Sequence, residues 1–255
     1  MDKNPTVPTP LPVIEIIRDS FQFVWDKRTR MLRALLIPAV LMLVAEQAFT
    51  FANDDPLKWA QVIIVMAIYI LFAITCHRLA LMGDQGVPDY GLRTWTQREW
   101  RYLGWSIVLI SIWVFLFFVV NSLLVSIVTR LMKAGVEIET IQPFEPFVWL
   151  ACTPILYLFS RFSVLYPAIS LDQSVSAVSA WRLTAHNGWR VAMAVCLLPW
   201  VLFFLLSYLL RENATHVEII IHKLLELILL AVEIVALSFS YKHLTKQVTL
   251  PVSGH

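Results

Sequence analysis

The chain has few charged residues for its length, and this scarcity is the first guide to its class. Of its 255 residues, 15% are charged and 58% are hydrophobic. Average soluble domains carry roughly 25% charged residues. A soluble domain of this length cannot enclose so many apolar runs, because much of its surface stays in water. The deficit therefore predicts a surface that faces lipid.

The net charge is also small, at +2, and the basic residues do not gather on one soluble face. Nucleic-acid-binding domains need such a basic face. We therefore expect no nucleic-acid partner.

Glycine and cysteine are scarce, which excludes several kinds of site. Seven glycines leave little material for a glycine-rich phosphate loop. The three cysteines (Cys76, Cys152 and Cys196) lie in apolar runs without CxxC or histidine spacing, so we expect buried free thiols. Motifs of serine hydrolases, zinc proteases, P-loop proteins and dinucleotide-binding domains are absent from the sequence. We predict no catalytic residue, no metal and no cofactor.

Long apolar runs are what the sequence does contain. A membrane-spanning helix needs roughly 20 mostly apolar residues. Six runs qualify: about 34–52, 59–81, 103–129, 147–169, 189–210 and 218–241. Their length suits helices rather than the short strands of a barrel. The sequence thus predicts an all-α, polytopic bundle of six transmembrane helices, with bends at Pro154, Pro167 and Pro199 in the fourth and fifth runs.

The distribution of lysine and arginine predicts the orientation. Fourteen of the twenty fall with the N-terminus, loops 82–102 and 170–190, and the C-terminus; five fall on the opposite side, and Arg161 lies inside a run. Cytoplasmic loops carry the excess of basic residues. Both termini are therefore predicted to be cytoplasmic. The first thirty residues contain acidic side chains and no short apolar core, so no cleavable signal peptide is expected.

The ends of the chain differ from the membrane domain at 31–246. Residues 1–11 and 247–255 are predicted to be tails, the first rich in proline. Residues 12–30 are predicted to contain an amphipathic helix, because apolar residues recur at three- and four-residue spacing opposite acidic ones. Such a helix either lies in the membrane interface or packs on the cytoplasmic end of the bundle.

Two stretches of the membrane domain resemble each other. Asp84-Gln85 precedes Trp100-Arg101, and Asp172-Gln173 precedes Trp189-Arg190 at nearly the same interval. This pattern predicts a parallel repeat of about 59–129 and 147–210. Short interfacial helices are expected on the cytoplasmic face, around 89–95 and 174–186. Thr96 with Glu99 predicts a capping box, and Asn187-Gly188 predicts a helix stop.

Basic and tryptophan residues gather at this predicted cytoplasmic face. They are either ordinary interfacial anchors or a site for anionic phospholipid headgroups. His77 is expected to be interfacial as well. The candidate headgroup residues are Arg78, Arg98, Arg101, Arg182, Arg190, Trp100 and Trp189.

Five ionisable residues are predicted to lie within the membrane: Glu46, Arg161, His222, Glu226 and Glu233. Such residues usually face the bundle interior or a wet cavity. Matching depths predict an Arg161–Glu233 ion pair, the alternative being that Arg161 reaches the inner headgroups. Glu46 and Glu226 are expected at one level. His222, Glu226 and Glu233 share a helical stripe that either carries protons or an ion or is a structural seam.

Several runs carry a family resemblance. They are Cys76–Leu81 with Arg98–Leu103, and Ser160–Ser163 with Pro167–Ile169 and Trp181–Thr184. They resemble bacterial six-span inner-membrane proteins of no assigned activity. They are also loosely similar to the membrane domain that precedes some glycerophosphodiester phosphodiesterases. The resemblance covers roughly 70–190 and implies a bacterial inner-membrane location. The hydrolytic domain of those phosphodiesterases is absent from this sequence, so no catalytic residue carries over.

Two functions follow from these features. Long spans, short loops and few intramembrane charges favour a non-catalytic scaffold, assembly or regulatory component that contacts another membrane protein. The repeat, the prolines, Arg161 and the intramembrane carboxylates favour a transporter or lipid-handling protein. A wet, polar-lined cavity at mid-depth would favour the second function, and a dry, close-packed bundle with apolar grooves would favour the first. An intramembrane enzyme has no specific support.

Overall fold

The protein is described here by a computed structural model that covers residues 9–50, 55–87, 95–134, 145–197, 199, 201–202, 205 and 216–249. Within these ranges every regular element is helical, which confirms the predicted all-α class. The main elements are α1 (Val13–Asp26), α2 (Arg28–Thr50), α3 (Asp55–Met82), η1 (Gly83–Gly86), α4 (Gln97–Lys133), α5 (Glu145–Ser163), α6 (Leu165–Ser170), α7 (Ala177–Leu183), α8 (Gly188–Ala192), the π-helical η3 (Met193–Leu197) and α10 (His216–Thr249).

Four helices within the described ranges are long and apolar enough to cross a membrane. They are Val62–Gly86, Gln97–Lys133, Cys152–Ser170 and Ile221–Lys246, which match the second, third, fourth and sixth predicted runs. A shorter apolar helix, Gly188–Leu197, lies at the start of the fifth run, and α2 covers most of the first. The structure therefore supports a membrane protein with four candidate spans, and the count of six stays a prediction.

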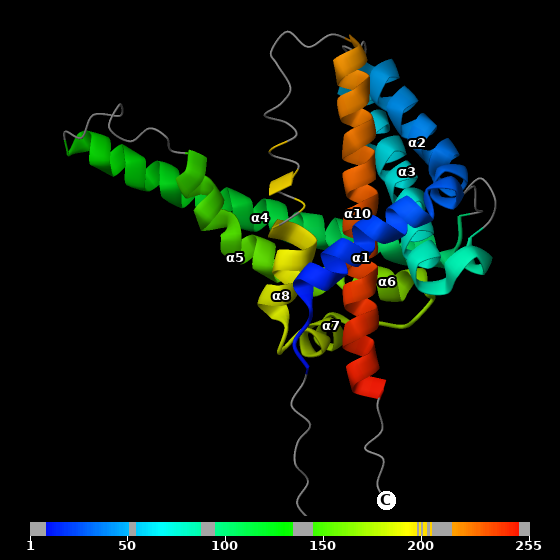
Figure 1. Ribbon diagram of the computed structural model, residues 1–255. Coiled ribbons are helices and arrows are strands. Elements are labelled where there is room, and N and C mark those ends of the chain that lie inside the picture. Colours follow the sequence, from blue (N-terminus) through cyan, green and yellow to red (C-terminus); the bar gives the residue numbers. More distant parts are fainter. Residues whose placement is uncertain are drawn as a thin grey trace, which may run out of the picture.

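The helices form two arms that diverge from a common base (Figure 1). The first arm consists of α2, α3 and α10, with α3 packed against both of the others. The second arm is the pair α4 and α5, which extends away from the first. Short α6 joins the arms at the base, because it contacts α3, α4 and α10. The largest buried side chains gather near this junction, among them Phe72, Leu165, Ile169 and Val235.

The outer part of α4 is an apolar surface with little cover. Only 6% of its most apolar window is buried, and Phe115, Phe118 and Leu123 are each at least 60% exposed. Its 37 residues correspond to roughly 55 Å of helix, well beyond the roughly 30 Å of a hydrocarbon core. A tilted orientation in the membrane accommodates that length.

Helix α1 crosses α10 near the base (Figure 1). It buries Ile16 and Ser20, and the Phe23 ring meets the Phe239 ring edge-on at 5.5 Å. The opposite face leaves Ile14 82% and Trp25 69% exposed. The predicted helix is thus present and packs on the bundle. Its exposed apolar face also suits the membrane interface, and contact with lipid there stays a prediction.

Local sequence signals explain the start of α4 and the break between α5 and α6. Thr96 and Glu99 form the predicted capping box at the start of α4. The fourth run is interrupted at Val164, between α5 and α6, because Pro167 has no N–H to bond the Ser163 carbonyl. This interruption agrees with the predicted bend.

The prediction of a helix stop at Asn187-Gly188 is wrong. Helix α7 already ends at Leu183, and Asn187 lies at the N-terminal cap of α8. A Cβ on Gly188 would lie 2.5 Å from the Tyr157 hydroxyl. Glycine is therefore needed here for the close approach of α8 to α5, not for helix termination.

Candidate functional site

A cavity of about 730 Å³ lies where the two arms diverge, and we call it the interarm cavity. Helices α3, α4, α5 and α10 supply most of its walls, and α6 and η3 complete them. Its lining is Val62, Val65, Met66, Tyr69, Ile70, Ala73, His77, Tyr102, Ser106, Ile110, Phe159, Ser163, Tyr166, Val195, Leu230, Glu233, Ile234 and Leu237. Most of these side chains are apolar, so the cavity suits a largely apolar occupant.

Polarity changes along the length of the interarm cavity. The α3 wall begins with Val62, Val65 and Met66 and ends with His77 nearest the base. Residues three or four apart share one face of a helix, so this wall is a single stripe of α3. The base end also contains the hydroxyls of Tyr102 and Tyr166. The cavity thus has an apolar outer end and a polar inner end.

The polar inner end is held by contacts between distant segments. His77 Nδ1 lies 2.8 Å from Ser238 Oγ, a hydrogen bond between α3 and α10. The Tyr102 and Tyr166 rings stack with their centroids 4.6 Å apart, which joins α4 to α6. His77 is only 1% exposed. His77 therefore faces the interior of the bundle, and its expected depth at the membrane interface stays a prediction.

Glu233 is the carboxylate of this cavity. It also lines a smaller cavity beside α1, formed in part by Ile17 and Phe21. It lies twelve residues after Ile221 and thirteen before Lys246, at the centre of the last candidate span. The lining of the interarm cavity includes no lysine and no arginine.

The predicted ion pair between Arg161 and Glu233 is not formed. Arg161 instead bonds to α7 and its C-cap: Nη2 donates to the Trp181 carbonyl at 2.6 Å and Nε to Thr184 Oγ1 at 3.0 Å. Its guanidinium also lies 3.4 Å from the centre of the Trp181 ring. Equal depth on two helices does not place side chains on facing sides. Here α5 packs on α7 and α8, and the Arg161 side chain therefore lies against α7.

Four charged side chains form a network at the base, which we call the basal network: Arg78, Arg98, Glu99 and Asp172. Arg98 donates to Asp172 at 3.0 Å and to Glu99 at 3.0 Å, and Arg78 donates to Asp172 at 3.3 Å. Arg78 further donates to the carbonyls of Gly86 and Ser170. Two cations thus meet two anions, which balances the charge.

The basal network changes the interpretation of two predicted headgroup residues. Arg78 and Arg98 are 8% and 9% exposed, buried rather than free at the face where we expected them. Their carboxylate partners explain how buried guanidinium groups are tolerated. Four of the other candidates are exposed at this end, namely Arg182, Arg190, Trp100 and Trp189, and Arg101 is half-buried. Of these, Arg101 donates to the Gln173 carbonyl and Arg190 to that of Leu11. Contact of this exposed set with lipid stays a prediction.

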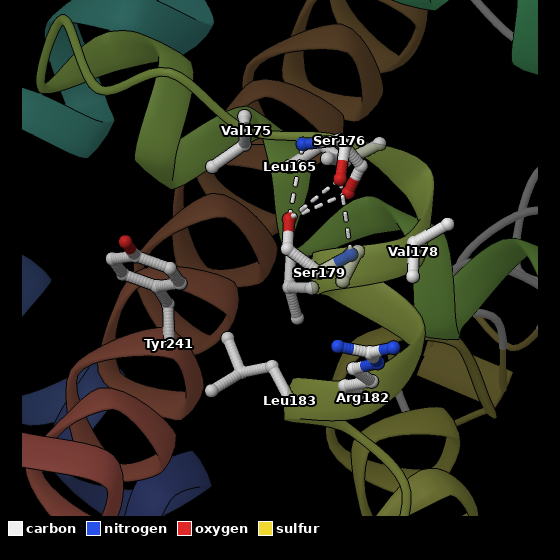
Figure 2. A pocket seen from close by; sticks show the side chains of 10 residues that line it. Leu165, Val175, Ser176, Val178, Ser179, Arg182, Leu183 and Tyr241 are labelled. Carbon is white, nitrogen blue, oxygen red and sulfur yellow. Dashed lines mark hydrogen bonds between the residues drawn. The ribbon is translucent and has the colours of Figure 1, made fainter.

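A second hollow, of about 440 Å³, lies beside α7 and is shown in Figure 2. Ser176 and Ser179 are bonded to each other there as the capping box of α7. Leu183 lies one turn beyond Ser179 on α7, and Tyr241 of α10 lies across from them in Figure 2. The Tyr241 hydroxyl donates to Gln173. Because these hydroxyls already have partners, we regard this hollow as the weaker candidate.

The remaining intramembrane candidates lie away from the interarm cavity. Glu226 pairs with His222 at 3.2 Å and with Lys223 at 2.9 Å. Glu233 is seven residues further along α10, roughly 10 Å away, and does not join this cluster. The side chain of Glu46 lies outside the described residues, so its predicted pairing in depth with Glu226 stays a prediction.

Sequence reasoning found Glu233 but missed the tyrosines around it. Tyr69, Ala73 and His77 recur every four residues on α3, as do Tyr102 and Ser106 on α4. Polar residues at four-residue spacing within an apolar run were the available signal, since they mark one helix face. Neither stripe taken alone shows that these sides of α3 and α4 face each other.

Comparison with family models, curated proteins and solved structures finds no match to this chain. The resemblance to six-span inner-membrane proteins therefore stays a prediction.

Proposed function

We propose that this protein is a lipid-handling membrane protein that binds one amphipathic molecule in the interarm cavity. The observation that carries the proposal is the cavity itself, about 730 Å³ with an apolar outer end and a polar inner end. Sites for small molecules typically measure roughly 300–1,000 Å³ and combine apolar walls with a few polar groups. A close-packed scaffold has no need of such a space.

The edge of the cavity suits entry from lipid. Val62, Tyr69 and Ile110 belong to its lining and are 55%, 41% and 47% exposed. Val62 and Ile110 lie on different arms, within apolar helices of the candidate spans. A molecule with an apolar chain can therefore pass from the bilayer between the arms without crossing water. Its polar end would meet the hydroxyls and the carboxylate further in.

We further propose six spans in a bacterial inner membrane, with both termini in the cytoplasm. The supporting evidence is the excess of basic residues in alternate loops. The first described residues also lie at the base, because the Leu11 N–H donates to Asn187 Oδ1 at 2.8 Å. The C-terminal end of α10 extends to the same end of the molecule in Figure 1. In this arrangement α2 and the run that starts at Gly188 are the two additional spans.

A scaffold function is the second candidate, and α4 is the observation in its favour. The exposed apolar surface of α4 exceeds what one crossing of the bilayer requires. Another membrane protein could pack along it, since helices associate in lipid through close side-chain packing.

The proposal is tested with a phospholipid that carries a photoactivatable group midway along one chain. The purified protein is reconstituted in bilayer discs with rising fractions of this probe, and cross-linked peptides are quantified by mass spectrometry. Cross-links at Ser106 and Leu230 should saturate, because one cavity holds one molecule. Cross-links at Leu123 on the outer part of α4 should rise in proportion to the probe, because that surface meets bulk lipid.

Ser106→Trp is the matched variant, since a large ring at this wall obstructs the cavity. It should remove the saturable labelling and leave the labelling at Leu123 unchanged. Labelling that rises linearly at every position, in wild type and variant alike, would refute the proposal and leave the scaffold function.

A further inference from the structure

We infer that the molecule bound in the interarm cavity carries a cationic group, an amine or a quaternary ammonium, that pairs with the Glu233 carboxylate. This inference rests on the proposed function and names the chemical class of its ligand. It follows from three properties of the cavity: its charge, its aromatic rings and its separation from the basic residues of the protein.

Charge is the first property. Glu233 is the one acidic side chain in the lining, and no lysine or arginine accompanies it there. It lies at the centre of the span Ile221–Lys246, where a carboxylate is most distant from water. The ion pairs formed by the described residues do not include it, in contrast to Glu226 on the same helix. A cation supplied by the ligand would compensate this charge, since buried ions are tolerated when paired.

Aromatic rings are the second property. Three tyrosines line the cavity, and Tyr102 and Tyr166 are stacked at its inner end. Tyr69 stands on α3 in the same stripe as His77. Tyrosine rings attract ammonium groups through their faces, and quaternary ammonium ligands are often bound in this way. The ring set thus adds affinity for the cation that Glu233 attracts.

The distribution of basic groups is the third property, and it argues against an anionic ligand. Arg78 and Arg98 lie outside the lining, and Asp172 and Glu99 balance their charges. The remaining basic candidate of the lining, His77, is bonded to Ser238. An anionic headgroup placed here would meet the Glu233 carboxylate without a cation to offset it. A cationic amphiphile fits the apolar outer end with its chain and the inner end with its head.

The test measures displacement of the saturable photolabel by three amphiphiles with the same chain: dodecyltrimethylammonium, dodecyl maltoside and dodecyl sulfate. On wild type, the cation should displace the photolabel more readily than the other two amphiphiles. Glu233→Gln should weaken displacement by the cation at least about tenfold, corresponding to ~1.4 kcal/mol. Displacement by the maltoside should not change. The partition of each amphiphile into the bilayer does not affect this comparison, because wild type and variant are measured with the same amphiphile in the same discs.

Glu226→Gln is the control, because it removes a carboxylate from α10 outside the cavity lining. It should match wild type with all three amphiphiles. Equal displacement by cation and maltoside in wild type, or an equal loss for both in Glu233→Gln, would overturn the inference. Saturable labelling would in that case still support the proposed function, whereas its absence in wild type would remove both. If Glu233→Gln does not fold, the inference is tested by whether the cation displaces the photolabel more readily than the maltoside does, on wild type and on Glu233→Asp.

Discussion

Removal of the Glu99 carboxylate should destabilise the base of the protein strongly. The Glu99 side chain is fully buried, accepts from the Thr96 N–H at 2.7 Å and pairs with Arg98 at 3.0 Å. Glu99→Ala therefore removes half of the capping box and one of the two anions that balance Arg98. Breaking a buried ion pair costs about 3–5 kcal/mol. Because Asp172 still contacts Arg98, we expect the lower part of that range, about 3–4 kcal/mol.

Glu99→Gln separates the two contributions. A glutamine at this position can still accept from the Thr96 N–H, so the capping box survives. Only the charge opposite Arg98 is lost, and we expect about 1–2 kcal/mol. Gln97→Ala is the control, because Gln97 is exposed on the same first turn of α4. It should leave the stability close to that of wild type.

The buried cysteines provide the assay. A thiol-reactive fluorophore reports unfolding as the protein is heated, since all three thiols are at most 5% exposed in the folded state: Cys76, Cys152 and Cys196. For a chain of this size, 1 kcal/mol corresponds to roughly 2–4 °C in Tm. Glu99→Ala should lower Tm by about 6–16 °C, and Glu99→Gln by about 2–8 °C. A Tm of Glu99→Ala equal to that of the Gln97→Ala control would refute the basal network as a source of stability.

Three further substitutions are predicted to affect the same labelling temperature. Arg161→Lys should lower the free energy of unfolding by about 2–3 kcal/mol although the charge is kept, because a lysine lacks the planar guanidinium that stacks on the Trp181 ring and donates two hydrogen bonds. Stability equal to that of wild type would contradict this. Gly188→Ala should cost about 1–3 kcal/mol, and Tyr157→Phe in the same chain should restore part of it by removing the clashing hydroxyl; independent effects of the two changes would argue against the clash. Ser238→Ala should cost about 1–2 kcal/mol, because it leaves the buried His77 without its partner, and Ser238→Thr, which keeps a hydroxyl, should cost less.

Composition and periodicity were sufficient to predict the helical class and the positions of the main helices. The start of α4 at Gln97, six residues before its apolar run, follows from the Thr96 and Glu99 capping box. The break at Val164 follows from Pro167, whose ring removes a backbone donor. These features are local, so the residues that cause them are close in sequence to those they affect.

The errors concern which sides of the helices face each other. Counting residues along a span gives depth, and on that basis Arg161 and Glu233 were matched. The structure turns Arg161 toward Trp181 on α7, because α5 packs there. The burial of His77 was likewise not predicted, because its partner Ser238 is 161 residues away in sequence. Such contacts depend on the packing of the helices, which a single sequence does not reveal.

The interarm cavity could not have been predicted for the same reason. It results from the divergence of α4 from α3, and each helix taken alone shows only a weak polar stripe. Glu233 was singled out because a carboxylate in the middle of a span is costly wherever it faces.

The most direct measurement of the proposed function is native mass spectrometry of the protein released from its own membrane in a mild neutral detergent. Wild type should retain one bound amphiphile per chain after delipidation has removed the annular lipids. Ser106→Trp, with its cavity obstructed, should have lost that bound mass, and the mass of the protein itself should differ from wild type only by the substitution. The same adduct on both proteins, or none on wild type, would contradict a ligand site between the arms.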